Sequence, residues 1–142
     1  MSILTKTIFS ACSLVLLITS LPFIVYAVGI SQVQGRPIAA NPNQYTQADL
    51  VKKWSQCSEI NPLFLESINP WQAVYDLYRA DIHSARPGHR ASWIVAKAHN
   101  IKHHEDGMAN WHLSGIALTI WLSRNWTAEQ LSATALRDDL CK

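Results

Sequence analysis

The sequence predicts an all-α protein in which an N-terminal transmembrane helix is followed by a small helical domain. Two observations predict this class. Beyond residue 45, apolar residues repeat at helical spacing, and no stretch alternates apolar with polar residues as a half-buried strand does. The first 35 residues carry one charged side chain, Lys6, and are rich in apolar residues. A chain of 142 residues then has room for one further domain of moderate size.

The composition excludes two classes of protein. The chain carries 12 Lys and Arg residues against 10 Asp and Glu residues, a formal net charge of +2, with no concentrated basic stripe. A dedicated nucleic-acid-binding protein needs such a stripe, so we expect no nucleic-acid partner. Hydrophobic residues make up 49% of the chain and charged residues 15%, which argues against intrinsic disorder.

The N-terminal apolar run is long enough to cross a membrane. Residues 7–30 contain no charge, and at about 1.5 Å per residue such a run spans the roughly 30 Å of hydrocarbon in a bilayer. A cleaved signal peptide, with its cleavage site at residues 25–27, is the alternative. We favour a retained signal anchor over residues 1–30, because the run is long for a signal peptide and only one lysine precedes it.

The charges at the N-terminus predict the orientation of this anchor. Lys6 and the N-terminal amine favour a cytoplasmic N-terminus, so we expect a single pass of the cytoplasmic membrane with the C-terminal domain outside, in the periplasm. In that oxidising compartment a disulfide between Cys57 and Cys141 would close a loop of roughly 84 residues and add a few kcal/mol of stability. Two unpaired thiols are the alternative.

A linker and then a helical domain are expected after the anchor. Residues 31–45 hold two Pro, one Gly, three Gln and two Asn without a hydrophobic period, which is typical of a linker. The helical domain spans residues 46–142. Its helices are expected to begin at Thr46, Asn61, Asn69, Ser92, Met108 and Thr127, most of which are residue types that cap helices. We expect the helix from Asn69 to end at the Arg-Pro-Gly of residues 86–88, and the last helix to run through residue 140.

Six tryptophans are spread over these helices, and we expect most of them in the core. An indole fills volume and needs one hydrogen-bond partner, which suits a buried position. Close to a membrane anchor, some can lie at the lipid interface instead. The six are Trp54, Trp71, Trp93, Trp111, Trp121 and Trp126.

A cluster of histidines and acids lies between residues 99 and 112. His99 and His103 are four residues apart, a spacing at which two imidazoles can bind zinc. A third ligand would come from Glu105, Asp106 or His112. We favour a polar loop between two helices and expect no metal, with His99 and His103 as the weak candidates. We also expect no cofactor, because the chain has no Gly-rich phosphate-binding loop.

Three segments carry a resemblance to a known family. Ile68-Asn69-Pro70 is similar to a G-I/V-D-P-x-G helix start, and residues 90–94, RASWI, stand where G-G-S-T-I is expected. Residues 114–131, SGIALTIWLSRNWTAEQL, resemble a stretch that ends in E-R-x-aromatic-S-K-E-E-I. These motifs resemble the family 51 peptidoglycan glycosyltransferase (transglycosylase) domain of class A penicillin-binding proteins. The resemblance implies a lysozyme-like helical domain that acts on lipid-linked disaccharide outside the cytoplasmic membrane.

The resemblance also implies roles for particular residues. Glu59 would be the catalytic acid or base, and Arg90, Ser92 and Lys97 would bind substrate. Two carboxylates are the rule in lysozyme-like chemistry, and Glu66 lies seven residues after Glu59. Because a proline lies between these two acids, we favour a pair of solvated surface acids over a catalytic pair.

Departures from the family pattern predict reduced or no catalysis. Ile60 follows Glu59 where the family has Asp, Ala96 and Lys97 replace its Q-Q, and Gly115 stands at the place of its second glutamate. We therefore expect a degenerate, truncated relative that acts in cell-envelope biology. Its expected partners are the lipid membrane, lipid-linked sugar or peptidoglycan, and envelope proteins. The alternative is a non-enzymatic helical module that binds a membrane or an envelope protein through Trp-rich faces.

Overall fold

The computed structural model describes residues 3–58, 62–79, 86–103 and 107–141. Within these ranges the chain forms six α-helices and one short 3-10 helix, and no β-strand. The all-α class and the long apolar N-terminal helix expected from the sequence are confirmed. The elements are α1 (Ile3–Ser31), η1 (Pro42–Gln44), α2 (Gln47–Ser58), α3 (Pro70–Tyr78), α4 (His89–His103), α5 (Met108–Asn125) and α6 (Ala128–Arg137).

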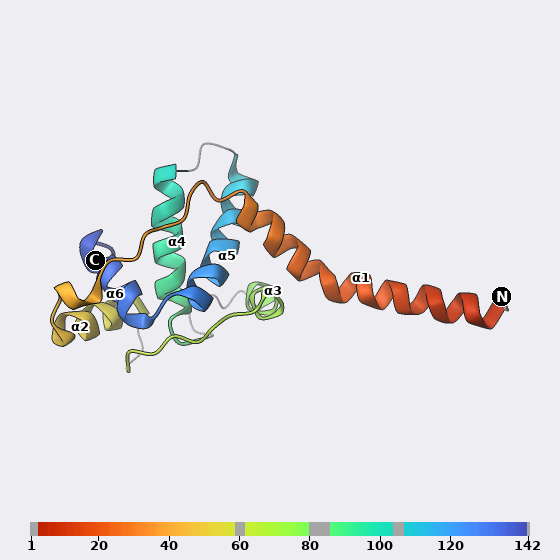
Figure 1. The fold of residues 1–142 in the computed structure, drawn as a ribbon, viewed down its shortest axis with the longest axis horizontal. Helices are drawn as coiled ribbons and strands as arrows, with labels where there is room; N and C mark the ends of the chain where they lie inside the picture. Colours follow the sequence, from red (N-terminus) through yellow and green to blue (C-terminus); the bar gives the residue numbers. More distant parts are fainter. Residues whose placement is uncertain (1–2, 59–61, 80–85, 104–106, 142) are drawn as a thin grey trace.

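The helices form a small bundle from which α1 projects (Figure 1). α4 and α5 pack against each other in the middle of the bundle, and α2 and α6 form the end that lies farthest from α1. α3 lies on the side where α1 leaves the bundle and contacts both α1 and α5. The N-terminus is therefore at the free tip of α1, and the C-terminal tail lies by α2 and α6.

The hydrophobic core lies between α2, α4, α5 and α6. Its largest buried side chains include Trp54, Leu118, Leu122 and Leu131, none of which is more than 1% exposed. A disulfide joins Cys57, at the end of α2, to Cys141 in the C-terminal tail, with 5.2 Å between the two Cα atoms. This bond fixes the C-terminal tail to α2, the first helix of the domain.

The first and last helices of the domain begin at the caps that the sequence predicts. The Thr127 hydroxyl accepts a hydrogen bond from the Gln130 amide at 3.2 Å, and the Gln130 side chain accepts one from the Thr127 amide at 2.8 Å. The Thr46 hydroxyl accepts a bond from the Asp49 amide at 3.2 Å. Each cap pairs amides that have no partner within the first turn of a helix.

The helix predicted to begin at Asn61 is wrong over residues 62–69, which form a bend followed by chain without regular secondary structure. Contacts with distant parts of the chain decide this conformation. The Ile68 amide donates to the Ser123 hydroxyl at 3.1 Å, and the Glu66 amide donates to the Pro87 carbonyl at 3.0 Å. A helix over these residues would use the same amides for its own bonds, so the tertiary contacts replace it.

α3 and α4 differ from the predicted boundaries. α3 ends at Tyr78, earlier than the predicted residue 86, and residues 80–85 lie outside the described chain. α4 begins at His89, three residues before the predicted Ser92. Gly88 makes this start possible, because its φ of 80° suits glycine and an added Cβ would lie 2.7 Å from Trp54 Cη2. The Ser92 hydroxyl is thereby inside the helix, donating to the Gly88 carbonyl at 3.0 Å.

The predicted linker lies along the bundle. The Ala40 amide donates to the Thr134 hydroxyl at 3.0 Å, and the Arg137 guanidinium donates to the Ile38 carbonyl at 3.0 Å. Both partners belong to α6, so residues 38–40 are held against the domain. The chain after α1 is therefore fixed to the bundle at several points.

The C-terminal part of α1 packs closely against α5. A Cβ added to Gly29 would lie 2.8 Å from both the Ala117 Cβ and the Leu113 carbonyl oxygen, so only glycine permits this approach. Pro22, inside α1, is also buried, and the Trp71 indole of α3 donates to the Thr19 carbonyl at 3.1 Å. α1 is therefore docked on the bundle over its last turns.

Residues Thr5–Ser31 of α1 form a helix long and apolar enough to cross a membrane, and an 18-residue window within it has a mean hydropathy of 2.3. A membrane anchor and a signal sequence both have these properties. Its side chains from Thr5 to Thr19 are exposed to the surroundings of the protein.

Replacing Gly29 with leucine is expected to weaken the docking of α1. The added side chain has no space against Ala117, and overpacking of this kind costs about 1–3 kcal/mol. We expect a lower thermal midpoint for the full chain in detergent, measured by near-ultraviolet circular dichroism. Ala27→Leu is the matched control, because Ala27 is exposed on the same helix and its variant should unfold like the unsubstituted protein.

Candidate functional site

A cavity of about 260 Å³ lies between α3, α4 and α5. Most of the cavity wall is apolar. Each of the three helices also contributes at least one polar side chain to it. The lining residues are Ala73, Asp76, His89, Trp93, His112, Ile116, Thr119 and Ile120. A largely apolar cavity with a few convergent polar groups is the usual form of a ligand site.

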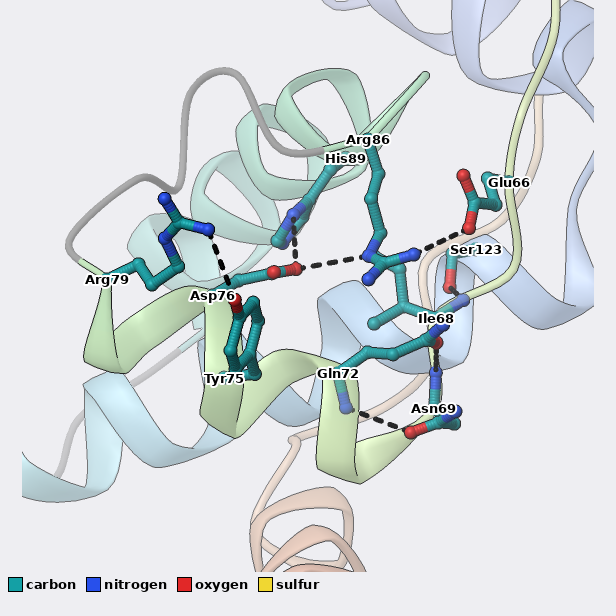
Figure 2. A network of polar contacts seen from close by, with 10 residues as sticks. All are labelled: Glu66, Ile68, Asn69, Gln72, Tyr75, Asp76, Arg79, Arg86, His89 and Ser123. Carbon is teal, nitrogen blue, oxygen red and sulfur yellow. Dashed lines mark hydrogen bonds and ion pairs between the residues drawn. The ribbon is translucent and has the colours of Figure 1, made fainter.

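Two of the lining residues, Asp76 and His89, belong to a network of polar contacts (Figure 2). Asp76 is 3% exposed, and its carboxylate lies 3.4 Å from Arg86 Nε and 3.8 Å from His89 Nδ1. Arg86 Nη1 in turn lies 2.7 Å from a carboxylate oxygen of Glu66. Arg86 thus bridges two acids, one buried and one at the surface.

Burial opposes the positive charge of Arg86, but its acidic partners outweigh that effect. Burial acts to lower the pKa of the guanidinium, whereas the hydrogen bond to Glu66 and the charges of Asp76 and Glu66 raise it above its ordinary value. The guanidinium is therefore held charged. A buried carboxylate such as Asp76 needs this compensation, because an unpaired buried charge is strongly unfavourable.

Local structure explains why these groups converge. Asp76 is the charged residue of α3 and lies in its last turn, pointing away from the exposed side of that helix toward α4 (Figure 2). His89 is the first residue of α4, and Arg86 stands in the turn just before it. Asn69 fixes the start of α3, because its side chain accepts from the Gln72 amide at 2.9 Å and the Gln72 side chain accepts from the Asn69 amide at 2.8 Å.

A second, smaller crevice adjoins the cavity on the side of α1. It measures about 80 Å³ and is almost entirely apolar. Ala73, Ile116 and Ile120 line both the crevice and the cavity. The other lining residues come from α1, α3 and α5: Pro22, Val25, Tyr26, Pro70, Val74, Leu113 and Ala117. The apolar crevice along α1 and the cavity at the Asp76 network are therefore neighbours.

This arrangement supports binding of a molecule with an apolar part and a polar end. The Asp76 carboxylate can accept hydrogen bonds from hydroxyl or amide groups, and an imidazole can donate or accept one. His89, beside Asp76, and His112, from α5, both line the cavity. Acid–base chemistry would use the same two histidines.

Of the residues predicted from the family resemblance, the three that the structure describes do not line this cavity. Glu59 falls outside the described residues. Arg90, Ser92 and Lys97 all belong to α4, but Ser92 is fully buried, Arg90 is half-buried and Lys97 is exposed. The structure does not bring these three into one site, and their role in binding substrate stays a prediction.

The two histidines considered for metal binding lie side by side on α4. The rings of His99 and His103 are 4.5 Å apart, and His99 Nε2 lies 3.2 Å from the Gln34 carbonyl oxygen. Burial lowers the pKa of His99, which favours the neutral ring. Among the described residues, no group of three His, Cys, Asp or Glu side chains is placed to hold a metal ion.

The tryptophans divide between core and surface. Trp54 is fully buried in the core, and its indole donates to the Pro62 carbonyl at 3.2 Å. Four others are half-buried and form two edge-to-face pairs, Trp93 with Trp111 and Trp121 with Trp126. Trp71 is 42% exposed.

Sequence reasoning missed the central residues of this site. Asp76 gives a usable signal, because it is the one charged side chain among residues 67–78, in an otherwise apolar helical pattern. Such an isolated charge is either exposed or paired in the interior. Glu66, expected as a solvated acid, pairs with Arg86, and nothing in the local sequence around Arg86 or His89 indicates their partner.

Comparisons of this chain with known protein families, curated proteins and solved structures found no match.

Proposed function

We propose that the chain is a membrane-anchored helical domain that binds a lipid-linked sugar of the cell envelope, with reduced or no catalysis. In this proposal α1 is a retained anchor in the cytoplasmic membrane, and the domain lies on the periplasmic side. The proposal includes descent from the lysozyme-like transglycosylase domain that the sequence resembles. The observation that carries it is the apolar crevice along α1, which adjoins a cavity walled by Asp76, His89 and His112.

We treat the crevice and the cavity as one path for the ligand. The crevice suits the hydrocarbon part of a lipid-linked sugar, and the cavity suits its sugar part. The crevice between α1 and α3 offers apolar side chains to a hydrocarbon chain that approaches along the anchor. Asp76 carries a negative charge, so it favours the hydroxyl groups of a sugar over a phosphate. His112 and Thr119 on α5 add hydrogen-bonding groups on the other side of the cavity.

The docking of α1 supports its retention as an anchor. Cleavage after residue 27 would remove Pro22, Val25 and Tyr26 and uncover the apolar side chains that they contact in the crevice. A signal peptide that is discarded has no need of a close fit to the mature domain. If the domain retains turnover, Glu59 remains the predicted acid or base.

The alternative module, which would bind an envelope protein through Trp-rich faces, has less support. Five of the six tryptophans are buried or half-buried, and four of these pair with each other. Their surface is largely used within the bundle.

Replacing Ile116 with tryptophan is expected to weaken ligand binding about tenfold, or about 1.4 kcal/mol. Ile116 lines both crevice and cavity, so a larger side chain there occupies the path. The measurement is the affinity of the full chain, in lipid nanodiscs, for a dye-labelled polyprenyl-diphosphate disaccharide. Ile101→Trp is the control, because Ile101 is 66% exposed on α4 and lines neither space.

Two results would contradict the proposed function. One is the absence of binding by the unsubstituted protein. The other is equal affinity in both variants, which would place the ligand outside this path. A polyprenol without the sugar is expected to bind more weakly, because it leaves the Asp76 wall unused.

A further inference from the structure

The outer side of α3 carries an apolar stripe that is largely exposed. Trp71, Val74, Tyr75 and Tyr78 follow each other at the spacing of one helical face, and they are 42%, 44%, 54% and 87% exposed. Asp76, the charged residue of this helix, is 3% exposed on the opposite side. α3 therefore exposes apolar side chains and buries its charged one, whereas a surface helix in water does the opposite.

This stripe is continuous with the surface of α1. The Trp71 indole donates to the Thr19 carbonyl at 3.1 Å, and Val74 lines the crevice with Val25 and Tyr26 of α1. Toward its N-terminus, α1 exposes large apolar side chains all round, among them Phe9, Leu16 and Leu17 at 64–70% exposure. Because the two surfaces are continuous, the environment that surrounds these side chains of α1 also surrounds the stripe on α3.

The length of α1 fixes where the bilayer ends. From Ile3 to Thr19, where α3 makes contact, the helix rises about 25 Å, which is short of the roughly 30 Å of hydrocarbon in a bilayer. Measured from the charged side chain of Lys6, about 20 residues are needed to cross, so the outer boundary lies near Tyr26. Thr19, where α1 contacts α3, therefore lies within the part of α1 that crosses the membrane.

We infer that α3 is an interfacial helix whose Trp71–Tyr78 stripe rests in the outer leaflet of the same bilayer that α1 crosses. This inference rests on α1 as a retained anchor and goes beyond the ligand site. Trp and Tyr side chains are enriched at the membrane interface, where their rings lie among apolar groups and their polar atoms reach water or headgroups. Arg79, just after the end of α3, donates a hydrogen bond to the Tyr75 hydroxyl at 3.1 Å and places a positive charge beside the stripe.

An environment-sensitive dye on the stripe tests this placement. The variant carries Cys12→Ser and Tyr78→Cys in the full chain, with the Cys57–Cys141 disulfide intact, reconstituted in phosphatidylcholine vesicles. Tyr78 is 87% exposed, so its substitution leaves the bundle unchanged, which far-ultraviolet circular dichroism verifies. We expect several-fold stronger quenching of the dye by a lipid-borne quencher than by aqueous iodide.

Two matched positions complete the experiment. Val51→Cys, again with Cys12→Ser, labels an exposed apolar position on α2, at the end of the bundle far from α1, and is expected to show iodide quenching (Figure 1). The unsubstituted protein labelled at Cys12, the free cysteine on α1, is expected to show lipid quenching.

Three results would overturn the inference. Iodide quenching at position 78 with lipid quenching at Cys12 places α3 in water and leaves the anchor intact. Protection of position 78 from both quenchers indicates that another protein, or a second copy of this chain, covers the stripe. Iodide quenching at Cys12 removes the anchor itself, and with it the proposed membrane location.

Discussion

Replacing Arg86 with methionine is expected to lower the free energy of unfolding by about 3–5 kcal/mol. The substitution keeps an unbranched apolar stem but removes the guanidinium, so the Asp76 carboxylate stays buried without its cationic partner. Glu66 also loses a partner, but its side chain is 38% exposed, so water compensates most of that loss. The measurement is the urea midpoint of the full chain in detergent, compared with that of the unsubstituted protein.

Two further variants identify the buried charge as the cause. Arg124→Met removes an exposed arginine of α5 and should change stability by no more than about 0.5 kcal/mol. Combining Arg86→Met with Asp76→Asn should cost less than the sum of the two single changes, because the amide carries no charge. A cost equal to that sum would contradict a coupled pair.

Removing the disulfide with Cys57→Ser and Cys141→Ser is expected to destabilise the domain by about 4 kcal/mol. The bond closes a loop with a sequence separation of 84, so its loss frees much of the unfolded chain. The tail that it holds is also strained, because Asp139 and Cys141 have φ values of 52° and 59°. Left-handed backbone of this kind costs roughly 1–2 kcal/mol per non-glycine residue.

A reductant distinguishes the disulfide from the other cysteine. Dithiothreitol should lower the thermal midpoint of the unsubstituted protein and of Cys12→Ser equally, since Cys12 is free and exposed on α1. It should leave the midpoint of the double serine variant unchanged. A midpoint of the unsubstituted protein that does not respond to reductant under unfolding conditions would show that the bond contributes no stability.

Local signals predicted the helices well, and long-range contacts decided where the predictions were wrong. Thr46 and Thr127 cap α2 and α6 through atoms a few residues away, so sequence alone is sufficient there. The Asn-Pro pair at residues 61 and 62 is equally compatible with a turn, and the hydrogen bond from the Ile68 amide to the Ser123 hydroxyl helps to hold the following chain in a non-helical path.

The same limit applies to the faces of the helices and to the site. The period of Trp71, Val74 and Tyr78 predicts one apolar side of α3, but it is the same whether that side meets a protein core or another apolar environment. The isolated charge of Asp76 hinted at an interior partner. That the partner is Arg86 follows only from how the tertiary fold places α3 beside the turn before α4, which local sequence does not encode.

The close crossing of α1 and α5 at Gly29 has a consequence for the proposed binding of a lipid-linked ligand. With α1 in a bilayer, this contact and the bonds of residues 38–40 to α6 leave no flexible tether between anchor and bundle. The mouth of the crevice then stays at one height above the membrane midplane. Encounter with a lipid-linked ligand becomes a search in two dimensions, in which confinement to the leaflet raises the effective concentration of the ligand. A weak intrinsic affinity would then be sufficient for a high occupancy.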